Sequence, residues 1–342
     1  MSGAPRHSPN AGLHQWLPKV WLSRGPAAWA LLPIAALYGA LVRLRQLAYR
    51  WHWAPSERLP VRVIVVGNVV AGGAGKTPVT QAIVQHLVQG QHRVGIVSRG
   101  HGRHSQEVLS VRADSLAREV GDEPLLLARS TGVPVFVGAR RAQAAQALLA
   151  QHPDTDIIVC DDGLQHLALA RDLEVLVMDE RGIGNGWLLP AGPLREPWPR
   201  KADLLLHSGP CPALAQSPCF AVTRQLASYA VNASGQRTDL STLKDRPVHA
   251  LAGIARPDTF FDMLRQQGLQ LAITQAWPDH ADFSTWTPPE GDAIVLCTEK
   301  DAVKLWSAHP QVLAVPLLLN MPSSFTAALD RLLSQSGKGE PL

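Results

Sequence analysis

The residues best suited to chemistry lie in a glycine-rich loop, VVGNVVAGGAGKTP at positions 65–78. Its glycines let successive backbone N–H groups point at phosphate oxygens, and the helix expected to follow adds its positive N-terminal end. Lys76 would neutralise the β- and γ-phosphates, and Thr77 would bind Mg²⁺. Val70 stands where the strict pattern has a glycine. The residues predicted to contact the nucleotide are Val70, Ala71, Gly72, Gly73, Ala74, Gly75, Lys76 and Thr77.

Carboxylates that could hold Mg²⁺ follow a predicted buried strand in DIIVCDDGLQH, residues 156–166. Asp161 and Asp162 come at its carboxyl end, where ligands bind in open α/β sheets. Paired carboxylates repel one another unless a cation lies beside them. We therefore expect both to serve the metal, the alternative being solvated acids of a turn. Asp179 ends a later predicted strand and is a weaker candidate for binding the metal.

Transfer of a phosphoryl group to a hydroxyl also needs a base near the acceptor and cations near the transferred group. The candidates are Arg99 and Arg103 in SRGHGR, Asp122 in GDEP, and Arg195 and Glu196 in PAGPLREP. Composition alone would explain each of them equally well as a helix cap or a solvated loop charge. His280, one of 13 histidines, would by itself be a surface residue or a satisfied core residue.

The elements that must position these residues follow a regular pattern after Pro60. Short β-branched runs such as RVIVV (62–66) and DIIVC (156–160) alternate with longer helical stretches. This pattern is typical of a mostly parallel sheet with helices on both faces, so we predict an α/β, P-loop NTPase-like fold. The proline-rich stretch 209–217 is predicted to be a linker, and the residues after it show a second, smaller α/β pattern.

Four parts are expected from these boundaries. They are a basic, Trp-rich docking helix at 1–54, a P-loop nucleotide-binding core at 55–208, a C-terminal α/β domain at 209–336 and a tail at 337–342.

The amino-terminal part differs from the rest in charge. Residues 1–60 carry seven Lys and Arg against one Glu, and five of the ten tryptophans. Residues 25–42 have no charge, so they could form about 27 Å of helix, at the short edge of what crosses a bilayer. Pro33 would bend it. We expect a membrane-docked or shallowly inserted helix, and an ordinary buried helix is the alternative.

Composition excludes several classes of protein. With 46% hydrophobic residues the chain is not intrinsically disordered, and a nucleic-acid partner is not expected because the basic charge belongs to one end. The four cysteines form no CxxC pair, which favours reduced cytosolic thiols over a disulfide framework or a zinc site.

Taken together, these stretches resemble one family, the tetraacyldisaccharide 4′-kinases of lipid A synthesis. The resemblance covers about residues 55–305 through GNVVAGGAGKTP, SRGHGR, GDEP, DDGLQH, NGWLLPAGPLREP, AGIARPDTFF, PDHADF and TEKDAVK, in that order. The family's phosphate loop likewise lacks the first glycine. His101 is a small departure, because the family more often has an aromatic residue there.

The resemblance implies an ATP-dependent, Mg²⁺-requiring kinase that phosphorylates the 4′-hydroxyl of an anionic, tetraacylated glucosamine disaccharide 1-phosphate. It also implies that the enzyme acts at the cytosolic face of a Gram-negative inner membrane. We expect the protein to be a monomer. By correspondence, Asp122 is the base and His280 its orienting partner, while Arg195 and Glu196 line the phosphate and metal site. Because His280 belongs to the second domain, we expect domain closure to assemble the Asp122–His280 pair.

Two other functions are compatible with a phosphate loop. A GTPase or ATPase switch or metal-delivery factor would need an Asn/Thr-Lys-x-Asp run or Cys/His clusters, and TEKD at 298–301 has the wrong spacing. A non-catalytic, membrane-bound nucleotide sensor would bind ATP without lipid-dependent turnover.

Overall fold

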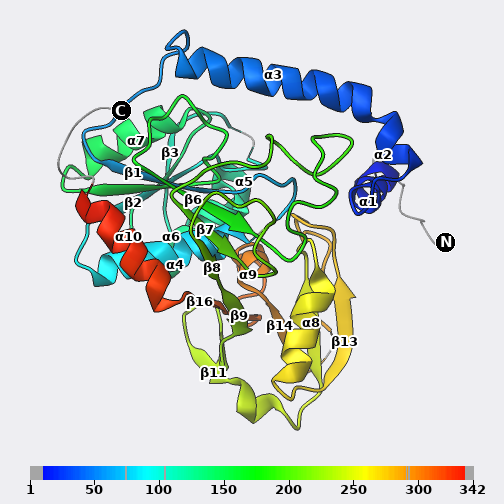
Figure 1. The fold of residues 1–342 in the computed structure, drawn as a ribbon. Coiled ribbons are helices and arrows are strands. Elements are labelled where there is room, and N and C mark those ends of the chain that lie inside the picture. Colours follow the sequence, from blue (N-terminus) through cyan, green and yellow to red (C-terminus); the bar gives the residue numbers. More distant parts are fainter. Residues whose placement is uncertain (1–10, 74, 104, 290, 292, 336–342) are drawn as a thin grey trace.

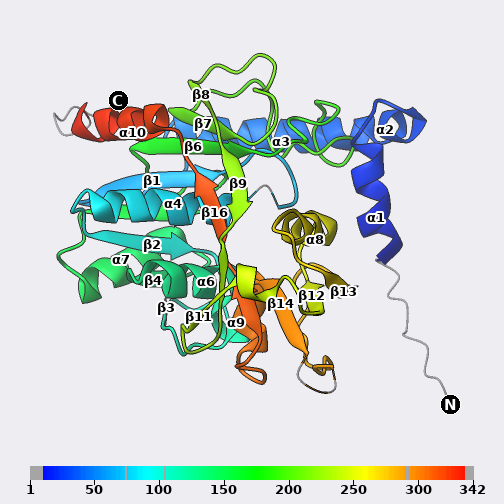
Figure 2. The same cartoon turned by 90° about the horizontal axis from the view of Figure 1, so that it is seen from below.

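The computed structural model describes residues 11–73, 75–103, 105–289, 291 and 293–335. Two sheets dominate the fold (Figure 1). An eight-stranded sheet forms the core, and a six-stranded sheet forms what we call the C-terminal unit. A two-stranded antiparallel ribbon, β9 (Thr223–Leu226) with β16 (Leu317–Asn320), runs between them (Figure 2). The expected α/β class with mostly parallel pairing is confirmed.

The core sheet has the strand order β3-β4-β2-β5-β1-β6-β7-β8, and all its pairs are parallel except β3 with β4. Its strands are β1 (Arg62–Gly67), β2 (Val94–Ser98), β3 (Leu109–Val111), β4 (Val135–Val137), β5 (Ile157–Asp161), β6 (Leu173–Met178), β7 (Leu204–His207) and β8 (Cys219–Ala221). The central strands β1 and β5 carry the phosphate loop and the paired aspartates at their carboxyl ends. Parallel pairing therefore brings these two motifs to one edge of the sheet.

Both faces of the core sheet are covered by helices because the side chains of its strands alternate in direction. In β1, Ile64 and Val66 belong to one hydrophobic cluster, whereas Val63 and Val65 belong to another. The first cluster includes side chains from α4 (Lys76–Gln89), α6 (Asp122–Thr131) and α10 (Ser323–Gln335), and the second includes side chains from α7 (Arg141–Gln151). The short helix α5 (Ala117–Val120) leads into α6.

The C-terminal unit has the strand order β11-β10-β15-β14-β12-β13. Its elements are β10 (Tyr229–Val231), β11 (Arg237–Asp239), the 3-10 helix η1 (Leu240–Leu243), β12 (Val248–Ala252), α8 (Pro257–Gln266), β13 (Leu271–Ala276), β14 (Ile294–Thr298), α9 (Glu299–Leu305) and β15 (Leu313–Val315). Helix α9 belongs to both units, since Ala302 and Leu305 pack in the C-terminal unit and Val303 packs in the core. It therefore joins the two units.

The expected boundary at residues 208 and 209 differs from the structure at both ends of the C-terminal unit. Strand β8 lies beyond that boundary but pairs with β7 and completes the core sheet. The last helix, α10, returns to the core, where Phe325, Leu329 and Leu333 are buried. The chain thus enters the C-terminal unit through β9 and leaves it through β16.

The amino-terminal part forms three helices, α1 (Ala11–Val20), α2 (Pro26–Ala30) and α3 (Leu32–Arg50). Pro33 does not bend a continuous helix as expected. It lies in the first turn of α3, where a missing N–H costs no hydrogen bond, and the break comes at Leu31. No helix in the described part of the chain is both long enough and apolar enough to span a bilayer. The predicted tail at 337–342 lies outside the described residues.

Candidate active site

The phosphate loop connects β1 to α4, so the positive end of α4 points toward it. Gly72 and Gly75 have positive φ angles, 91° and 74°, which side chains rarely adopt. A Cβ at Gly75 would also meet the guanidinium of Arg224 from β9, which would have to shift. The loop geometry therefore requires glycine at these two positions. Ala74, predicted to contact the nucleotide, lies outside the described residues.

Lys76 is held at the loop by two side chains. Its Nζ lies 3.3 Å from Oδ1 of Asn68 and 3.5 Å from Oδ1 of Asp162. Asn68 is fully buried, and its Nδ2 donates to the carbonyl of Val70 at 2.7 Å. Asn68 thus fixes both the lysine and the turn of the loop. The sequence analysis did not single it out, although a polar residue directly after a buried strand was the available signal.

The loop at residues 190–197 is bonded to the phosphate loop through the backbone. Arg195 N–H donates to the Val69 carbonyl at 2.7 Å, and Ala71 N–H donates to the Pro193 carbonyl at 2.8 Å. The Arg195 side chain then reaches Asp162, with Nη1 3.5 Å from Oδ1. Arg195 and Lys76 therefore approach the same carboxylate oxygen, and the structure brings these two predicted cations together.

The paired aspartates occupy different environments. Asp161 is 1% exposed, and its Oδ1 accepts a 2.7 Å hydrogen bond from Thr80 on α4. Its Oδ2 is buried with no hydrogen-bond partner among the described residues. Burial raises the pKa of Asp161 to about 7, and the nearby charge of Glu123 adds to the effect. A buried carboxyl with one unused oxygen fits a bound divalent cation, since oxygen ligands suit Mg²⁺. Thr77, in the first turn of α4, is also buried.

Glu196, expected at the metal, is engaged elsewhere. Its Oε1 accepts from Gln165 Nε2 at 2.7 Å and its Oε2 accepts from Arg200 Nε at 2.9 Å. Among the described residues, no three His, Cys, Asp or Glu side chains lie close enough to hold a metal ion. The structure therefore does not bring Glu196 together with Asp161 and Asp162, because Arg200 already neutralises its charge.

The weaker candidates also have structural partners. Asp179 accepts a 2.8 Å hydrogen bond from Arg181, whose Nη2 donates to the Gly73 carbonyl at 3.0 Å. Asp179 thus anchors an arginine that supports the phosphate loop. Arg103 donates to the Glu107 carbonyl at 2.6 Å and so stabilises its own loop. Arg99 adds to the effect of burial in lowering the pKa of Arg141.

Asp122 and His280 meet between the two units. Asp122 is the first residue of α6 and is 8% exposed. His280, in the loop after β13, lies with Nδ1 3.0 Å from Oδ2 of Asp122. We expected domain closure to assemble this pair, but the contact is already formed in this structure. The ring of His101 also packs edge-on against His280, at 5.5 Å between centroids.

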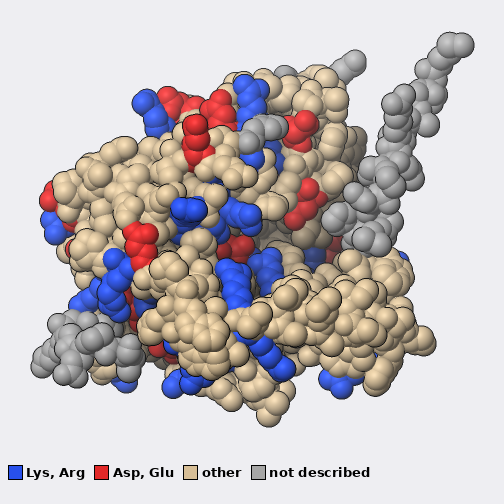
Figure 3. Space-filling model, turned by 90° about the horizontal axis from the view of Figure 1, so that it is seen from above, with Lys and Arg blue, Asp and Glu red and all other residues tan. Residues whose placement is uncertain are grey.

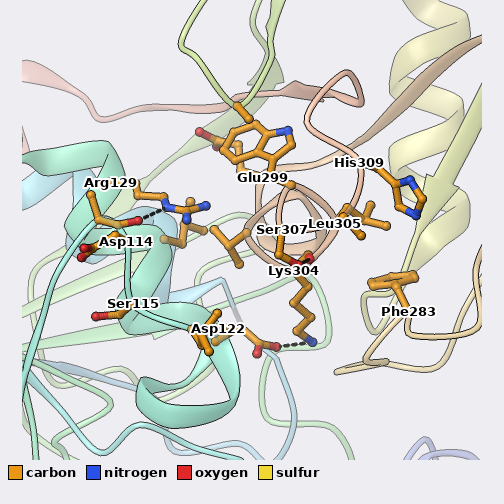
Figure 4. A pocket seen from close by; sticks show the side chains of 18 of the residues that line it. Asp114, Ser115, Asp122, Arg129, Phe283, Glu299, Lys304, Leu305, Ser307 and His309 are labelled. Atoms are coloured by element: carbon orange, nitrogen blue, oxygen red, sulfur yellow. Dashed lines mark hydrogen bonds and ion pairs between the residues drawn. The ribbon is translucent and has the colours of Figure 1, made fainter.

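A lysine that the sequence analysis assigned no role completes the surroundings of Asp122. Nζ of Lys304, from α9, lies 2.6 Å from Oδ2 of Asp122, and the two side chains point toward each other (Figure 4). Burial favours the protonated acid, but hydrogen bonds from His280 and Lys304 outweigh it and lower the pKa of Asp122. Asp122, His280 and Lys304 lie in the wall of a pocket of about 1270 Å³. Asp122 is therefore held as a carboxylate in the wall of this pocket.

Comparison with known proteins decides the family. The family model for LpxK, tetraacyldisaccharide-1-P 4′-kinase, matches residues 27–334. The chain belongs to this family. It is 58% identical to the tetraacyldisaccharide 4′-kinase of Acidovorax sp. (strain JS42), over 99% of this chain and 100% of that protein. It is 47% identical to the tetraacyldisaccharide 4′-kinase of Methylibium petroleiphilum, over 97% of this chain and 96% of that protein.

A solved structure agrees with this assignment. LpxK from Aquifex aeolicus, described as an "apo" form in complex with ATP, superimposes with a TM-score of 0.80 at 31% identity. The match covers 90% of this chain and 99% of that chain. The predicted resemblance, the P-loop kinase fold and the ATP-dependent kinase activity of lipid A biosynthesis are confirmed. The switch, metal-delivery and sensor alternatives are not supported.

In this member of the family the amino-terminal helices contact the loop that carries Arg195. The Tyr38 hydroxyl of α3 donates to the Arg195 carbonyl at 2.8 Å, and Arg45 donates to the Gln165 carbonyl at 2.9 Å. Closer to the chain start, Trp21 Nε1 donates to the Pro190 carbonyl at 2.9 Å. One side of the amino-terminal part is therefore built into the active-site loops.

Proposed function

We propose that this kinase transfers the γ-phosphoryl group of ATP to the 4′-hydroxyl of tetraacyldisaccharide 1-phosphate with Asp122 as general base and His280 as its orienting partner. The observation that carries the proposal is the partly buried hydrogen bond between these two residues. It occupies Oδ2, and Oδ1 of Asp122 has no hydrogen-bond partner among the described residues. A carboxylate with one oxygen fixed and the other available suits proton acceptance.

The proposed reaction balances without a further reactant. The 4′-oxygen forms a bond to the γ-phosphorus while the bond to the β–γ bridging oxygen breaks, so that ADP leaves. The hydroxyl proton passes to Oδ1 of Asp122. Because the transition state is loose, positioning and charge neutralisation contribute most of the rate. Lys76 and Arg195, which converge on Asp162, supply two of the positive charges.

We include Mg²⁺ in the proposal, held by Thr77, Asp161 and Asp162. The buried, unpartnered Oδ2 of Asp161 supports this set, while the engaged carboxylate of Glu196 argues against a fourth member. The ion would neutralise phosphate charge. An Asp161→Asn variant should need a higher Mg²⁺ concentration for half-maximal activity. An unchanged Mg²⁺ dependence would remove Asp161 from the set.

We further propose that the enzyme docks on the cytosolic face of the inner membrane through α3. Ile34, Leu37, Leu41 and Leu44 recur at spacings of three and four residues, and each is more than half exposed. The opposite side of α3 holds Ala35, Gly39 and Tyr38 against the protein. The molecule seen from above, where α3 lies in Figure 1, shows Lys and Arg as well as Asp and Glu side chains among broad uncharged areas (Figure 3). An apolar stripe with basic neighbours is typical of a helix lying in the plane of an anionic membrane.

This arrangement fits a monomer whose substrate stays in the bilayer. The acylated disaccharide would reach Asp122 while its acyl chains remain in the membrane beside α3. In this proposal the C-terminal unit acts as a smaller domain that closes over the bound nucleotide.

Incubation of the full-length protein with γ-labelled ATP and disaccharide 1-phosphate lipid in mixed micelles tests the activity. Label should pass to the lipid with the wild type, and Lys76→Ala should reduce the rate by at least about a hundredfold, because it removes charge neutralisation from the transferred group. Absence of label in the lipid with the wild type would overturn the proposal.

A further inference from the structure

The stretch TEKDAVK, residues 298–304, forms the start of α9 and is fixed in place by its polar side chains. Thr298 is the N-cap, and its hydroxyl accepts from the Asp301 N–H. Asp301 is 1% exposed, and its Oδ2 accepts from the Gly253 N–H at 2.9 Å. Glu299 accepts from the Leu317 N–H at 3.1 Å. These bonds cap the helix and tie it to the Gly253 backbone of the C-terminal unit and to β16, but they give its two lysines no role.

The two lysines lie on the side of α9 that faces the core. Lys300 and Lys304 are four residues apart, so they share one face of the helix. Val303, between them, is buried in the hydrophobic cluster of the core. Packing of α9 against α6 therefore delivers both ammonium groups to the start of α6, where Asp122 lies.

Lys304 connects the base to the histidine loop. Its Nζ lies 2.6 Å from Oδ2 of Asp122 and donates to the Ala281 carbonyl at 2.7 Å. The side chains of Lys304 and Asp122 are each 10% exposed, so solvent screens this pair little. One ammonium thus ties the core carboxylate to the residue that follows His280. Together with the His280 hydrogen bond it saturates Oδ2.

Lys300 contacts the other nitrogen of the histidine. Its Nζ lies 3.3 Å from Nε2 of His280, 3.0 Å from Oδ1 of Asp279 and 3.6 Å from Oε1 of Glu123. Although burial favours the neutral amine, these two acids raise the pKa of Lys300, which therefore stays charged. An ammonium can only donate hydrogen bonds, so Nε2 must accept. The ring proton is then on Nδ1, where it is donated to Asp122.

We propose that Lys300 and Lys304 are the positioning residues of the catalytic pair. Lys304 fixes Oδ2 of Asp122 against the histidine loop, and Lys300 sets the His280 tautomer that donates to the same oxygen. Oδ1 is left as the proton acceptor. The inference rests on the proposed role of Asp122 as base, and it assigns to TEKDAVK a function in the reaction.

The charged groups around Asp122 influence its pKa, so the proposal can be tested through the pH dependence of kcat/KM. They are Glu123 on its own helix, Lys300 and Lys304 on α9, Asp279 and His280 on the loop after β13, and His101 beside His280. Burial acts to raise the pKa of Asp122, and Lys304 is one of the groups that lower it. Loss of Lys304 should therefore move the acidic limb of kcat/KM to higher pH.

The experiment compares full-length Lys304→Gln, Lys304→Arg and Lys300→Met with wild type, using the exposed Lys201→Gln as matched control. We expect kcat to fall about tenfold to a hundredfold in Lys304→Gln and Lys300→Met, because misplacement by about 1 Å can cost a hundredfold. KM for ATP should change less than about threefold. The acidic limb should shift to higher pH in Lys304→Gln, and Lys304→Arg should keep its wild-type position.

Nitrogen-15 spectra of histidine-labelled protein test the tautomer directly, with His280→Gln identifying the signal. Wild type should show a protonated Nδ1 and an unprotonated Nε2, and Lys300→Met should lose this preference. If Asp122→Asn is impaired while Lys304→Gln keeps the wild-type rate and pH profile, or if wild-type Nε2 carries the proton, the inference is wrong. If Asp122→Asn is itself unimpaired, the proposed base is wrong instead.

Discussion

Nδ1 of His280 lies 3.0 Å from Oδ2 of Asp122, although 158 residues separate them in the chain. Asp122 begins a helix of the core, and His280 sits in a loop of the C-terminal unit. The contact therefore joins the two units at the carboxylate that we propose accepts the hydroxyl proton. A change on either side of it should affect turnover more than nucleotide binding.

Asp122→Asn should lower kcat by roughly 10²–10⁴, because it removes the proposed general base while keeping the shape of the side chain. His280→Ala should lower kcat as well, since Asp122 loses its orienting partner. Initial rates of lipid phosphorylation measure this effect, with equilibrium ATP binding as control. A loss of less than about tenfold in Asp122→Asn would contradict the assignment.

Asn68→Ala should weaken ATP binding. Asn68 is buried, and its amide holds both Lys76 and the Val70 carbonyl, so alanine leaves the carbonyl unpaired and the lysine held by Asp162 alone. A hydrogen bond to a charged group contributes about 1.5–3 kcal/mol, which corresponds to about a tenfold to hundredfold rise in the ATP dissociation constant. Isothermal titration with ATP checks this value. The exposed Asn320→Ala is the control, and equal affinities in both variants would refute the role of Asn68.

Gly121→Ala should reduce both stability and turnover. Gly121 has φ 95°, and a Cβ there would lie 3.0 Å from the Cα of Gly100. The next residue is Asp122, so relief of this clash would displace the base. Gly132→Ala is a matched control, because Gly132 also has positive φ but nothing within 4 Å of an added Cβ. Gly132→Ala should cost about 1–2 kcal/mol of unfolding free energy and leave kcat unchanged, as denaturation and rate measurements would reveal.

His166 should make the folded protein sensitive to mild acid. Burial, followed by the charges of Arg141 and Arg171, lowers its pKa to about 4, and its Nε2 accepts from the Arg141 N–H. Since the pKa of an unfolded-state histidine is about 6.5, the unfolded state binds an extra proton between these values. Stability is therefore lost as pH falls from about 6.5 toward 4. His166→Gln should show a smaller loss of unfolding free energy between pH 7.5 and 5.5 in urea titrations, and an identical loss would be contrary evidence.

Replacement of Ile34, Leu37, Leu41 and Leu44 together by serine should weaken docking on anionic lipid vesicles by at least tenfold. Each apolar side chain buried in the membrane contributes about 1.5–3 kcal/mol. ATP binding should stay unchanged, because the opposite side of α3 makes the contacts to the Arg195 loop. Vesicle sedimentation measures the docking on lipid vesicles. Leu214→Ser, on an exposed loop, is the control, and unaltered sedimentation of the fourfold variant would exclude α3 as the docking surface.

The sequence by itself determined the family, the fold class and the phosphate loop. Short sequence patterns suffice for these features. A glycine-rich loop between a β-branched run and a helix indicates a phosphate-binding loop, and the buried strands of a parallel sheet appear in the sequence as continuous apolar runs. Asp161 and Asp162 could be placed beside that loop for the same reason, since the ends of parallel strands meet at one edge of a sheet.

Only the tertiary structure decided which charged side chains share a site. Glu196 follows Arg195 in sequence, yet Arg200 binds it, while Lys304 lies 182 positions after Asp122 and touches it. The positions of α9 and α10 likewise depend on packing between residues far apart in the chain, which a short stretch of sequence cannot predict. Charges pair according to distance in space, and that distance is set by how the two sheets and α9 pack together. The sequence alone therefore predicted the reaction, and the fold decided which side chains surround the proposed base, Asp122.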